Sequence, residues 1–334
     1  MVMKKFLNDP DNIVRELLEG LYLSNQDRLK LLDNNLVVSC NLGDRKRVHV
    51  VTLGGSGHEP GLSGYVGRGM LDISVPGDIF AAPGPELCYD AVRLGLEASG
   101  GEGVLLVVLN HPADMMSADI VMERVRAENL NVRKIVTRDD VSMPGQPSEE
   151  RRGLVGCIPL IKIAASLAAE GTPLSELYDC CRDFLSGLAT VTVALRGATH
   201  PQSGNKIAAL GDDEMEIGTG QHGEASGQKT TLKSADETAE MMLSTLLEHV
   251  SFQKGDKALV LVSGSGSTTL MELLIVFRKV FSLLKQRGVA VGARWVGEIM
   301  TVQETAGFQL SLARMSSRFL SCWESECDTP YYRV

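Results

Sequence analysis

Blocks of apolar residues alternate with amphipathic stretches along the first half of the chain. Three runs rich in apolar and β-branched residues, at 48–53, 103–109 and 132–136, have the length of buried strands. Apolar residues recur at helical spacing in 12–24, and 118–128 also predicts a helix. Buried strands that alternate with helices are typical of a parallel or mixed sheet with helices on both faces. The pattern therefore predicts an α/β fold.

The second half continues this alternation after a polar, glycine-rich loop at 145–156. The pattern predicts helices at 158–169 and 174–188, a strand at 191–195, a helix at 234–249, a strand at 258–262, a helix at 270–284, and strands at 289–296 and 308–313. A length of 334 residues suits two domains of roughly 100–200 residues each. We therefore predict two α/β domains, at 1–186 and 187–334, each with a mixed or largely parallel sheet flanked by helices.

The composition, 44% hydrophobic and 22% charged, is that of an ordinary soluble globular protein. The formal net charge of -9 repels phosphate backbones, so nucleic acid is not expected as a partner. No apolar run approaches the roughly 18 residues of a membrane span, so no membrane partner is expected either. Seven scattered cysteines without a CxxC pair, and an N-terminus without an apolar signal segment, indicate a cytoplasmic protein.

Two loops follow predicted strands and carry residues capable of chemistry. One is 54–60, with His58 among glycines, and the other is 110–114, which ends at Asp114. In α/β sheets ligands bind beyond the carboxyl ends of the strands, where both loops are expected to lie. Each residue also has a structural interpretation, since His58 suits a hydrogen-bonded structural histidine and Asp114 suits a helix N-cap.

Two further loops carry candidate chemistry in the second half. Residues 264–269 form a glycine-rich turn between a predicted strand and helix, but the Lys of a phosphate-binding GxxxxGK[ST] loop is missing. Such a turn is more often a matter of backbone geometry than of nucleotide binding. Residues 197–230 form a long polar segment that contains His222, and long ordered loops are often functional. As a lone residue, His222 also suits an ordinary turn.

Seven distinctive segments extend along the chain. They are VTLGGSGHEP at 51–60, GRGMLD at 67–72, PGDIF at 76–80, DDV at 139–141, RRGLVG at 151–156, GDDEMEIG at 211–218 and GFQLSL at 307–312. In this order they resemble the substrate-binding subunit of dihydroxyacetone kinases (DhaK), which is also the first domain of single-chain ATP-dependent kinases. The resemblance covers about residues 5–315 and implies a DhaK-like pair of α/β domains.

The resemblance implies roles for particular residues. In the family, the histidine of a GxGxHGE motif holds a short-chain ketone as a covalent hemiaminal, and the matching residue is His222. His58 would hydrogen-bond the substrate and assist proton transfer, and Asp114 would orient and deprotonate the attacking hydroxyl. The residues implied to line the substrate pocket are Gly55, Ser56, Gly57, His58, Asp114 and His222.

The family also implies partners for this chain. The phosphoryl donor, ATP or ADP with Mg²⁺, would sit on a separate helical nucleotide-binding subunit (DhaL-like), so no cofactor is expected on this chain. In one version of the system, a phosphotransferase-system protein recharges that subunit. The resemblance thus implies a transferase subunit of glycerol metabolism that phosphorylates dihydroxyacetone only with its partner, and a homodimer.

The chain departs from the family pattern at the strand-end loops. Leu109 stands where the family usually has Lys, and His111 stands where it has Tyr. An altered pocket is compatible with a related hydroxyketone such as erythrulose. It is also compatible with a catalytically silent dihydroxyacetone sensor that co-activates a transcription regulator. The presence of His58, Asp114 and His222 favours the enzyme.

Overall fold

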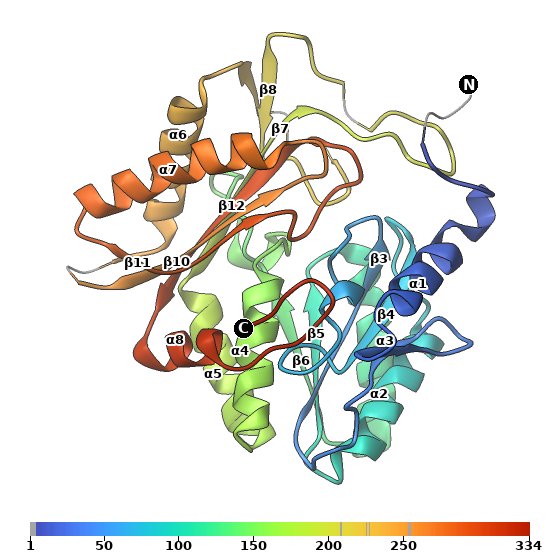
Figure 1. Ribbon diagram of the computed structural model, residues 1–334. Helices are drawn as coiled ribbons and strands as arrows, with labels where there is room; N and C mark the ends of the chain where they lie inside the picture. Colours follow the sequence, from blue (N-terminus) through green and yellow to red (C-terminus); the bar gives the residue numbers. More distant parts are fainter. Residues whose placement is uncertain (1–4, 208, 225, 227, 253–254) are drawn as a thin grey trace. The chain divides into compact units, whose positions relative to one another are not determined.

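The computed structural model describes residues 5–207, 209–224, 226, 228–252 and 255–334 (Figure 1). The chain divides into two compact units, each of which is an α/β assembly with its own sheet. The first unit comprises Met1–Thr137, Cys157–Arg182 and Cys322–Val334, and the second comprises Arg138–Gly156 and Asp183–Ser321. The predicted fold class, two α/β domains with sheets flanked by helices, is confirmed.

The first unit is built on a six-stranded mixed sheet in the order β1-β2-β4-β3-β5-β6. Its strands are β1 (Leu29–Leu31), β2 (Val37–Ser39), β3 (His49–Ser56), β4 (Ile73–Ile79), β5 (Val104–Leu109) and β6 (Val132–Thr137). The neighbours β4-β3-β5-β6 are parallel, and β1 and β2 add antiparallel pairs at one edge. Every residue of β5 is buried, as its uninterrupted apolar sequence predicts.

Four helices contact this sheet: α1 (Ile13–Leu23), α2 (Pro85–Ser99), α3 (Pro112–Ala127) and α4 (Cys157–Ala169). Helix α5 (Leu174–Ser186) follows α4. Helices α2 and α3 pack against each other, α2 on β3 and β5 and α3 on β5 and β6, while α4 contacts β3 and β5 (Figure 1). Nearly all of α4 is buried, including Lys162, whose ammonium donates to the carbonyls of Cys322 and Ser325.

The second unit has a six-stranded sheet in the order β11-β10-β12-β7-β8-β9. Its strands are β7 (Leu188–Arg196), β8 (Glu214–Ile217), β9 (Gln228–Thr231), β10 (Lys257–Gly264), β11 (Ala290–Gly297) and β12 (Ala306–Met315). Among the strand pairs formed by its described residues, only β10–β11 is parallel, so this sheet is mixed and mainly antiparallel. Helices α6 (Ala235–His249) and α7 (Leu270–Gln286) pack together over its apolar face, and α8 (Ser317–Glu324) follows β12.

The chain crosses between the two units four times, at 137/138, 156/157, 182/183 and 321/322. The sequence predicted a single boundary, at 186/187. One crossing lies close to that position. The other crossings arise because segment 138–156 hydrogen-bonds to β7 and because the C-terminal residues pair with the Gly67–Gly69 turn. Long-range contacts of this kind leave no mark in apolar periodicity.

Within the part of the chain that the structure describes, no helix has both the length and the apolar character needed to cross a bilayer. The seven cysteines are free thiols, and five of them are buried.

Candidate functional site

Strands β3 and β5 are parallel neighbours, with Thr52 paired to Val107. Their carboxyl ends therefore lie at the same edge of the first sheet. The loop 54–60 leaves from the end of β3, and 110–114 leaves from the end of β5. The prediction that both candidate loops lie at the carboxyl edge is confirmed.

Backbone sterics hold the loop at the end of β3. A Cβ on Gly55 would lie 2.8 Å from the backbone nitrogen of Ala81, and Gly57 has a φ of +99°, which favours glycine. His58 is only 3% exposed, and its ring centroid lies 5.2 Å from that of Phe80. The Ser56 hydroxyl donates to the Gly77 carbonyl at 2.8 Å. The family-matched residues of this loop thus lie in a tightly constrained turn.

Asp114 belongs to the first turn of α3 and is 5% exposed. It is the third residue of a helix that begins at Pro112, and the N-cap position belongs to His111, so the N-cap interpretation of Asp114 is wrong. The carboxyl charge reaches the neighbouring Cys88, where burial first and Asp114 second raise the pKa of the thiol to about 12. A carboxylate in the first turn of a helix is also stabilised by the positive end of the helix dipole.

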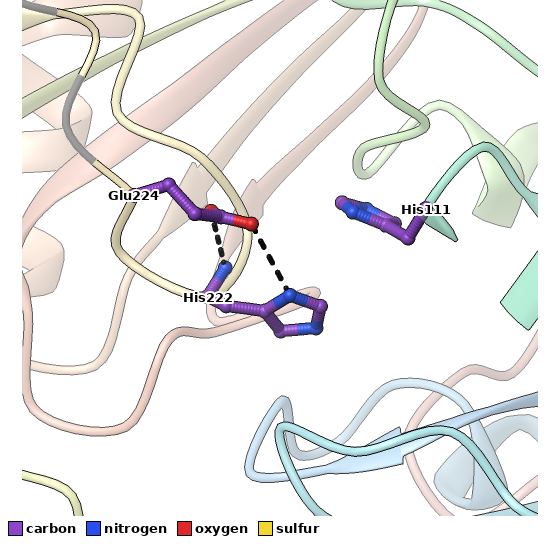
Figure 2. A group of neighbouring side chains, drawn as sticks. All are labelled: His111, His222 and Glu224. Carbon is purple, nitrogen blue, oxygen red and sulfur yellow. Dashed lines mark hydrogen bonds and ion pairs between the residues drawn. The ribbon is translucent and has the colours of Figure 1, made fainter. Parts of the chain in front are cut away.

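His222 lies in a tight turn after β8, in the second unit (Figure 2). Its backbone N–H donates to Glu224 Oε2 at 3.0 Å, and its Nδ1 lies 3.3 Å from Glu224 Oε1. The N–H of Gly220 donates to the Glu224 carbonyl, which closes the turn. Because an ionised carboxylate can only accept hydrogen bonds, it favours the tautomer with the proton on Nδ1 and the lone pair on Nε2.

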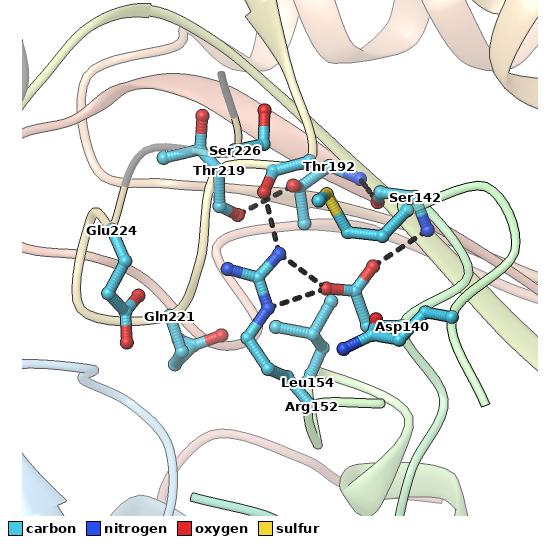
Figure 3. Close-up of polar contacts among 12 residues, drawn as sticks. Asp140, Ser142, Arg152, Leu154, Thr192, Thr219, Gln221, Glu224 and Ser226 are labelled. Carbon is cyan, nitrogen blue, oxygen red and sulfur yellow. Dashed lines mark hydrogen bonds and ion pairs between the residues drawn. The ribbon is translucent and has the colours of Figure 1, made fainter. Parts of the chain in front are cut away.

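Arg152 holds the main chain just before His222 (Figure 3). Its Nη2 donates to the Gly218 carbonyl at 2.6 Å, and its Nε donates to Asp140 Oδ2 at 2.8 Å. A Cβ on Gly220 would lie 2.5 Å from Arg152 Nη1 and 1.9 Å from Glu224 Oε2. A side chain at 220 would therefore have to displace the ends of the Glu224 and Arg152 side chains.

A second set of side chains fixes the residues next to His222. Gln221 is buried and donates to the Thr301 carbonyl at 2.9 Å. Gln309 donates to Gln221 Oε1 at 3.1 Å and accepts from the Val155 N–H at 3.1 Å. The Thr192 hydroxyl donates to the Thr219 carbonyl at 2.6 Å.

The segment that carries Arg152 is itself anchored by a buried carboxyl. Asp139 accepts from the N–H groups of Leu154 and Gly156, at 2.9 Å and 3.0 Å, and from the Thr190 hydroxyl at 2.6 Å. Burial raises the pKa of Asp139, and these three neutral donors offset burial only partly. The DDV and RRGLVG segments are thus hydrogen-bonded to each other, and Arg152 of the second segment binds the His222 turn.

The glycine-rich turn at 264–269 is occupied by the chain's own carboxylate. Glu298 Oε2 accepts from the Gly266 N–H at 3.1 Å, and a Cβ on Gly264 would lie 2.3 Å from the same carboxyl group. The N–H groups of Ser265 and Ser267 donate to the carbonyls of Gly307 and Thr305. Three amides that could have held a phosphate already have acceptors, which argues against a nucleotide in this turn.

The predicted site residues divide between the units. Gly55, Ser56, Gly57, His58 and Asp114 belong to the first unit, and His222 belongs to the second. Sequence reasoning had assigned no role to Glu224, Arg152, Gln221 or Gln309. All four lay within motifs already noted, but the partners of Arg152, Gln221 and Gln309 are distant in the sequence.

Comparisons with known proteins agree with the motifs. A family model described as the Dak1 domain matches residues 19–331. A protein of Listeria innocua, the "PTS-dependent dihydroxyacetone kinase 1, dihydroxyacetone-binding subunit DhaK", is 35% identical over 314 residues, which cover 94% of each chain. A tomato protein named "Putative 3,4-dihydroxy-2-butanone kinase" is 31% identical, and the match spans 99% of this chain but 57% of that longer protein.

Solved structures show the same fold. The native dihydroxyacetone kinase of C. freundii matches with a TM-score of 0.90 and 25% identity, over 99% of this chain and 60% of that one. A structure described as the dihydroxyacetone kinase operon co-activator DhaQ matches with a TM-score of 0.87 and 29% identity, over 93% and 96% of the two chains. The resemblance read from the motifs is therefore confirmed, and the chain belongs to the Dak1 domain family of DhaK-type subunits.

Proposed function

We propose that this chain is the dihydroxyacetone-binding subunit of a dihydroxyacetone kinase and that it holds the ketone on His222. The observation that carries this proposal is the pairing of His222 Nδ1 with the Glu224 carboxylate in a turn kept narrow by Gly220. The pairing leaves Nε2 as the nucleophilic nitrogen. A quarter of the His222 side chain is exposed, so a small molecule can reach the ring.

The covalent step is an addition without a leaving group. The Nε2 lone pair attacks the carbonyl carbon, and the C=O π electrons move to oxygen, which gains a proton and becomes a hydroxyl. The ring then carries a positive charge until the Nδ1 proton departs. The Glu224 carboxylate stabilises this charge and passes the Nδ1 proton to solvent, which replaces the proton that solvent gave to the oxygen. The C=O π bond and the Nδ1–H bond are lost, and one C–N bond and one O–H bond are formed. Glycerol has no carbonyl carbon and cannot form this bond.

Phosphoryl transfer would then use residues of the first unit. Asp114 would take the proton of the terminal hydroxyl as its oxygen attacks phosphorus and the bond to the leaving group breaks. His58 would hydrogen-bond the substrate, and the loop Gly55–Gly57 would line the pocket. The donor, ATP or ADP with Mg²⁺, would bind to a helical partner subunit, and the filled glycine turn at 264–269 supports this assignment.

The assembly belongs to the same proposal. We expect a homodimer in the cytoplasm that works with a DhaL-like subunit and, in the phosphotransferase-dependent version, with a donor protein that recharges it. The names of the Listeria innocua and Escherichia coli relatives, which are PTS- and PEP-dependent dihydroxyacetone kinase subunits, support the phosphotransferase-dependent version.

The covalent step is tested with dihydroxyacetone labelled with ¹³C at the carbonyl carbon. On binding, the NMR signal should move from the ketone region to that of tetrahedral carbons, and His222→Ala should abolish the new signal. Asp114→Asn should keep the signal but lose turnover when a nucleotide-loaded DhaL-like subunit is added. A wild-type chain that binds the ketone without a tetrahedral carbon signal would contradict the proposal.

A sensor that co-activates a transcription regulator is the second candidate. It is favoured by Leu109, an apolar residue, 3% exposed, at the end of β5, where the family usually has a lysine. The likeness to the DhaQ co-activator points in the same direction. A sensor would form the adduct but show no turnover with any nucleotide-loaded subunit, and Leu109→Lys would be the variant expected to gain turnover.

A further inference from the structure

The turn that carries His222 is held by a cation, the guanidinium of Arg152. Arg152 contacts it through the Gly218 carbonyl, and its guanidinium lies against the α-carbon of Gly220 (Figure 3). The Thr219 carbonyl between these glycines is bound by another group, the Thr192 hydroxyl. All three main-chain contacts lie within four residues before the nucleophile.

The guanidinium is oriented by a fully buried partner. Asp140 Oδ2 accepts from Arg152 Nε at 2.8 Å and forms an ion pair with Nη2 at 2.7 Å, while Asp140 Oδ1 accepts from the Ser142 N–H at 2.9 Å. Nε therefore binds Asp140, while Nη2 donates to the Gly218 carbonyl. A planar guanidinium can make both bonds at once, whereas the single nitrogen of lysine on a flexible stem cannot hold the same geometry.

We propose that Arg152 is a positioning residue that aims the His222 ring at the ketone. Through the Gly218 carbonyl it sets the direction in which the turn leaves β8, and so the direction of Nε2. This inference rests on the proposed function of His222. It assigns to the RRGLVG segment a role in the covalent step, without contact with the substrate.

The remaining contacts separate positioning from folding. Gln221 is tied to Thr301 and Gln309, and the Glu224 carboxylate binds the His222 N–H. These bonds keep the turn folded when the Arg152 bond to Gly218 is lost. A lysine at 152 would still neutralise Asp140. The expected defect is therefore a misdirected ring in a folded protein.

The experiment measures the adduct in the full chain with carbonyl-labelled dihydroxyacetone. Arg152→Lys should weaken the adduct equilibrium about tenfold, the loss expected for one charge-assisted hydrogen bond. Its thermal midpoint should stay within about 2 °C of wild type. Arg278 of α7 forms an exposed ion pair with Asp236 of α6, and the matched change Arg278→Lys should leave both quantities unchanged.

A second measurement is the pH dependence of adduct formation. Because Glu224 still faces Nδ1 in Arg152→Lys, the pH profile of adduct formation should keep the wild-type shape at a lower level. If Arg152→Lys does not fold, Arg152→Ala in millimolar guanidinium chloride replaces it, and the added cation should restore adduct formation. Wild-type adduct strength in Arg152→Lys, or no recovery in the alanine variant, overturns this inference. A wild-type chain that forms no adduct overturns the proposed function instead.

Discussion

The loop 54–60 and the His222 turn are each supported by a buried aspartate, and the two aspartates are stabilised by different partners. Asp72 supports the start of β3, whose far end carries the loop 54–60. It accepts two hydrogen bonds from Arg47, at 2.6 Å and 2.9 Å, and one from the Val50 N–H at 2.8 Å. Its Oδ2 also lies 3.1 Å from His49 Nδ1.

Asp139 supports the segment beneath the His222 turn, and its partners are two N–H groups and one hydroxyl. Burial opposes ionisation of both carboxyls. His49 and the Arg47 cation outweigh burial and lower the pKa of Asp72, whereas neutral donors do not outweigh burial and the pKa of Asp139 is raised. In this pair of buried carboxyls, the additional partners His49 and Arg47 decide the direction in which the pKa moves.

The largest predicted effect follows from removing the charge of Asp72. Asp72→Asn should lower the free energy of unfolding by about 3 kcal/mol at pH 7, because it leaves the Arg47 and His49 side chains without their carboxylate. A carboxyl whose pKa is lowered by folding stabilises the protein above its unfolded pKa, about 3.9. That stability disappears as the pH falls through the folded pKa. The difference between wild type and variant should therefore shrink as the pH falls below about 4.

Asp139→Asn is the matched control, and its pH dependence should run the other way. Because folding raises the pKa of Asp139, the folded protein gains stability as the pH falls from 7 through that raised pKa, and the gain is complete below the unfolded pKa. The difference between wild type and Asp139→Asn should therefore grow on acidification. Denaturant titrations from pH 7 down to pH 3.5 measure both differences, and parallel trends in the two variants would contradict this account.

Backbone crowding in the loop 54–60 predicts a smaller loss. In Gly55→Ala the three atoms nearest to the new methyl belong to the main chain: Ala81 N at 2.8 Å, Ala81 O at 3.1 Å and Asp78 O at 3.2 Å. Because none of these can rotate away, unfolding should become easier by about 1–3 kcal/mol. In Gly54→Ala the methyl meets only the end of the Leu62 side chain at 3.0 Å, so its loss should be clearly smaller. Thermal unfolding of the two variants tests this, and equal losses would rule out the steric explanation.

The same contrast explains which parts of the molecule were predictable. The strand and loop around 49–60 follow from one contiguous sequence, because a β-rich run ends in glycines that the backbone itself requires. Strand β4 was missed because Pro76, Gly77 and Asp78 break its apolar pattern. It is a strand because it pairs with β3 in the sheet, a contact that its own sequence does not reveal.

The support of the His222 turn was not predictable from local patterns. Arg152 and Gly218 are 66 residues apart in the sequence, and Val155 and Gln309 are 154 apart. Each residue taken alone is an ordinary polar or apolar side chain. Only tertiary packing brings them together, although the motifs did indicate which segments mattered.

The smallest predicted effect on stability accompanies a clear effect on binding. In Gly220→Ala the new methyl would meet Glu224 Oε2 at 1.9 Å and Arg152 Nη1 at 2.5 Å, which are the ends of two flexible side chains. Both can move aside, so the free energy of unfolding should change by less than about 1 kcal/mol. The movement takes the carboxylate from His222 Nδ1 and the guanidinium from Gly218. The adduct with dihydroxyacetone should weaken about tenfold or more.

Gly211→Ala is the control for this variant. The atoms nearest to its new methyl lie at an ordinary 3.4 Å, so the adduct should be unchanged. If Gly220→Ala instead lost stability and kept the adduct, the turn would be held by backbone sterics like the loop 54–60, and the difference between the two loops would vanish.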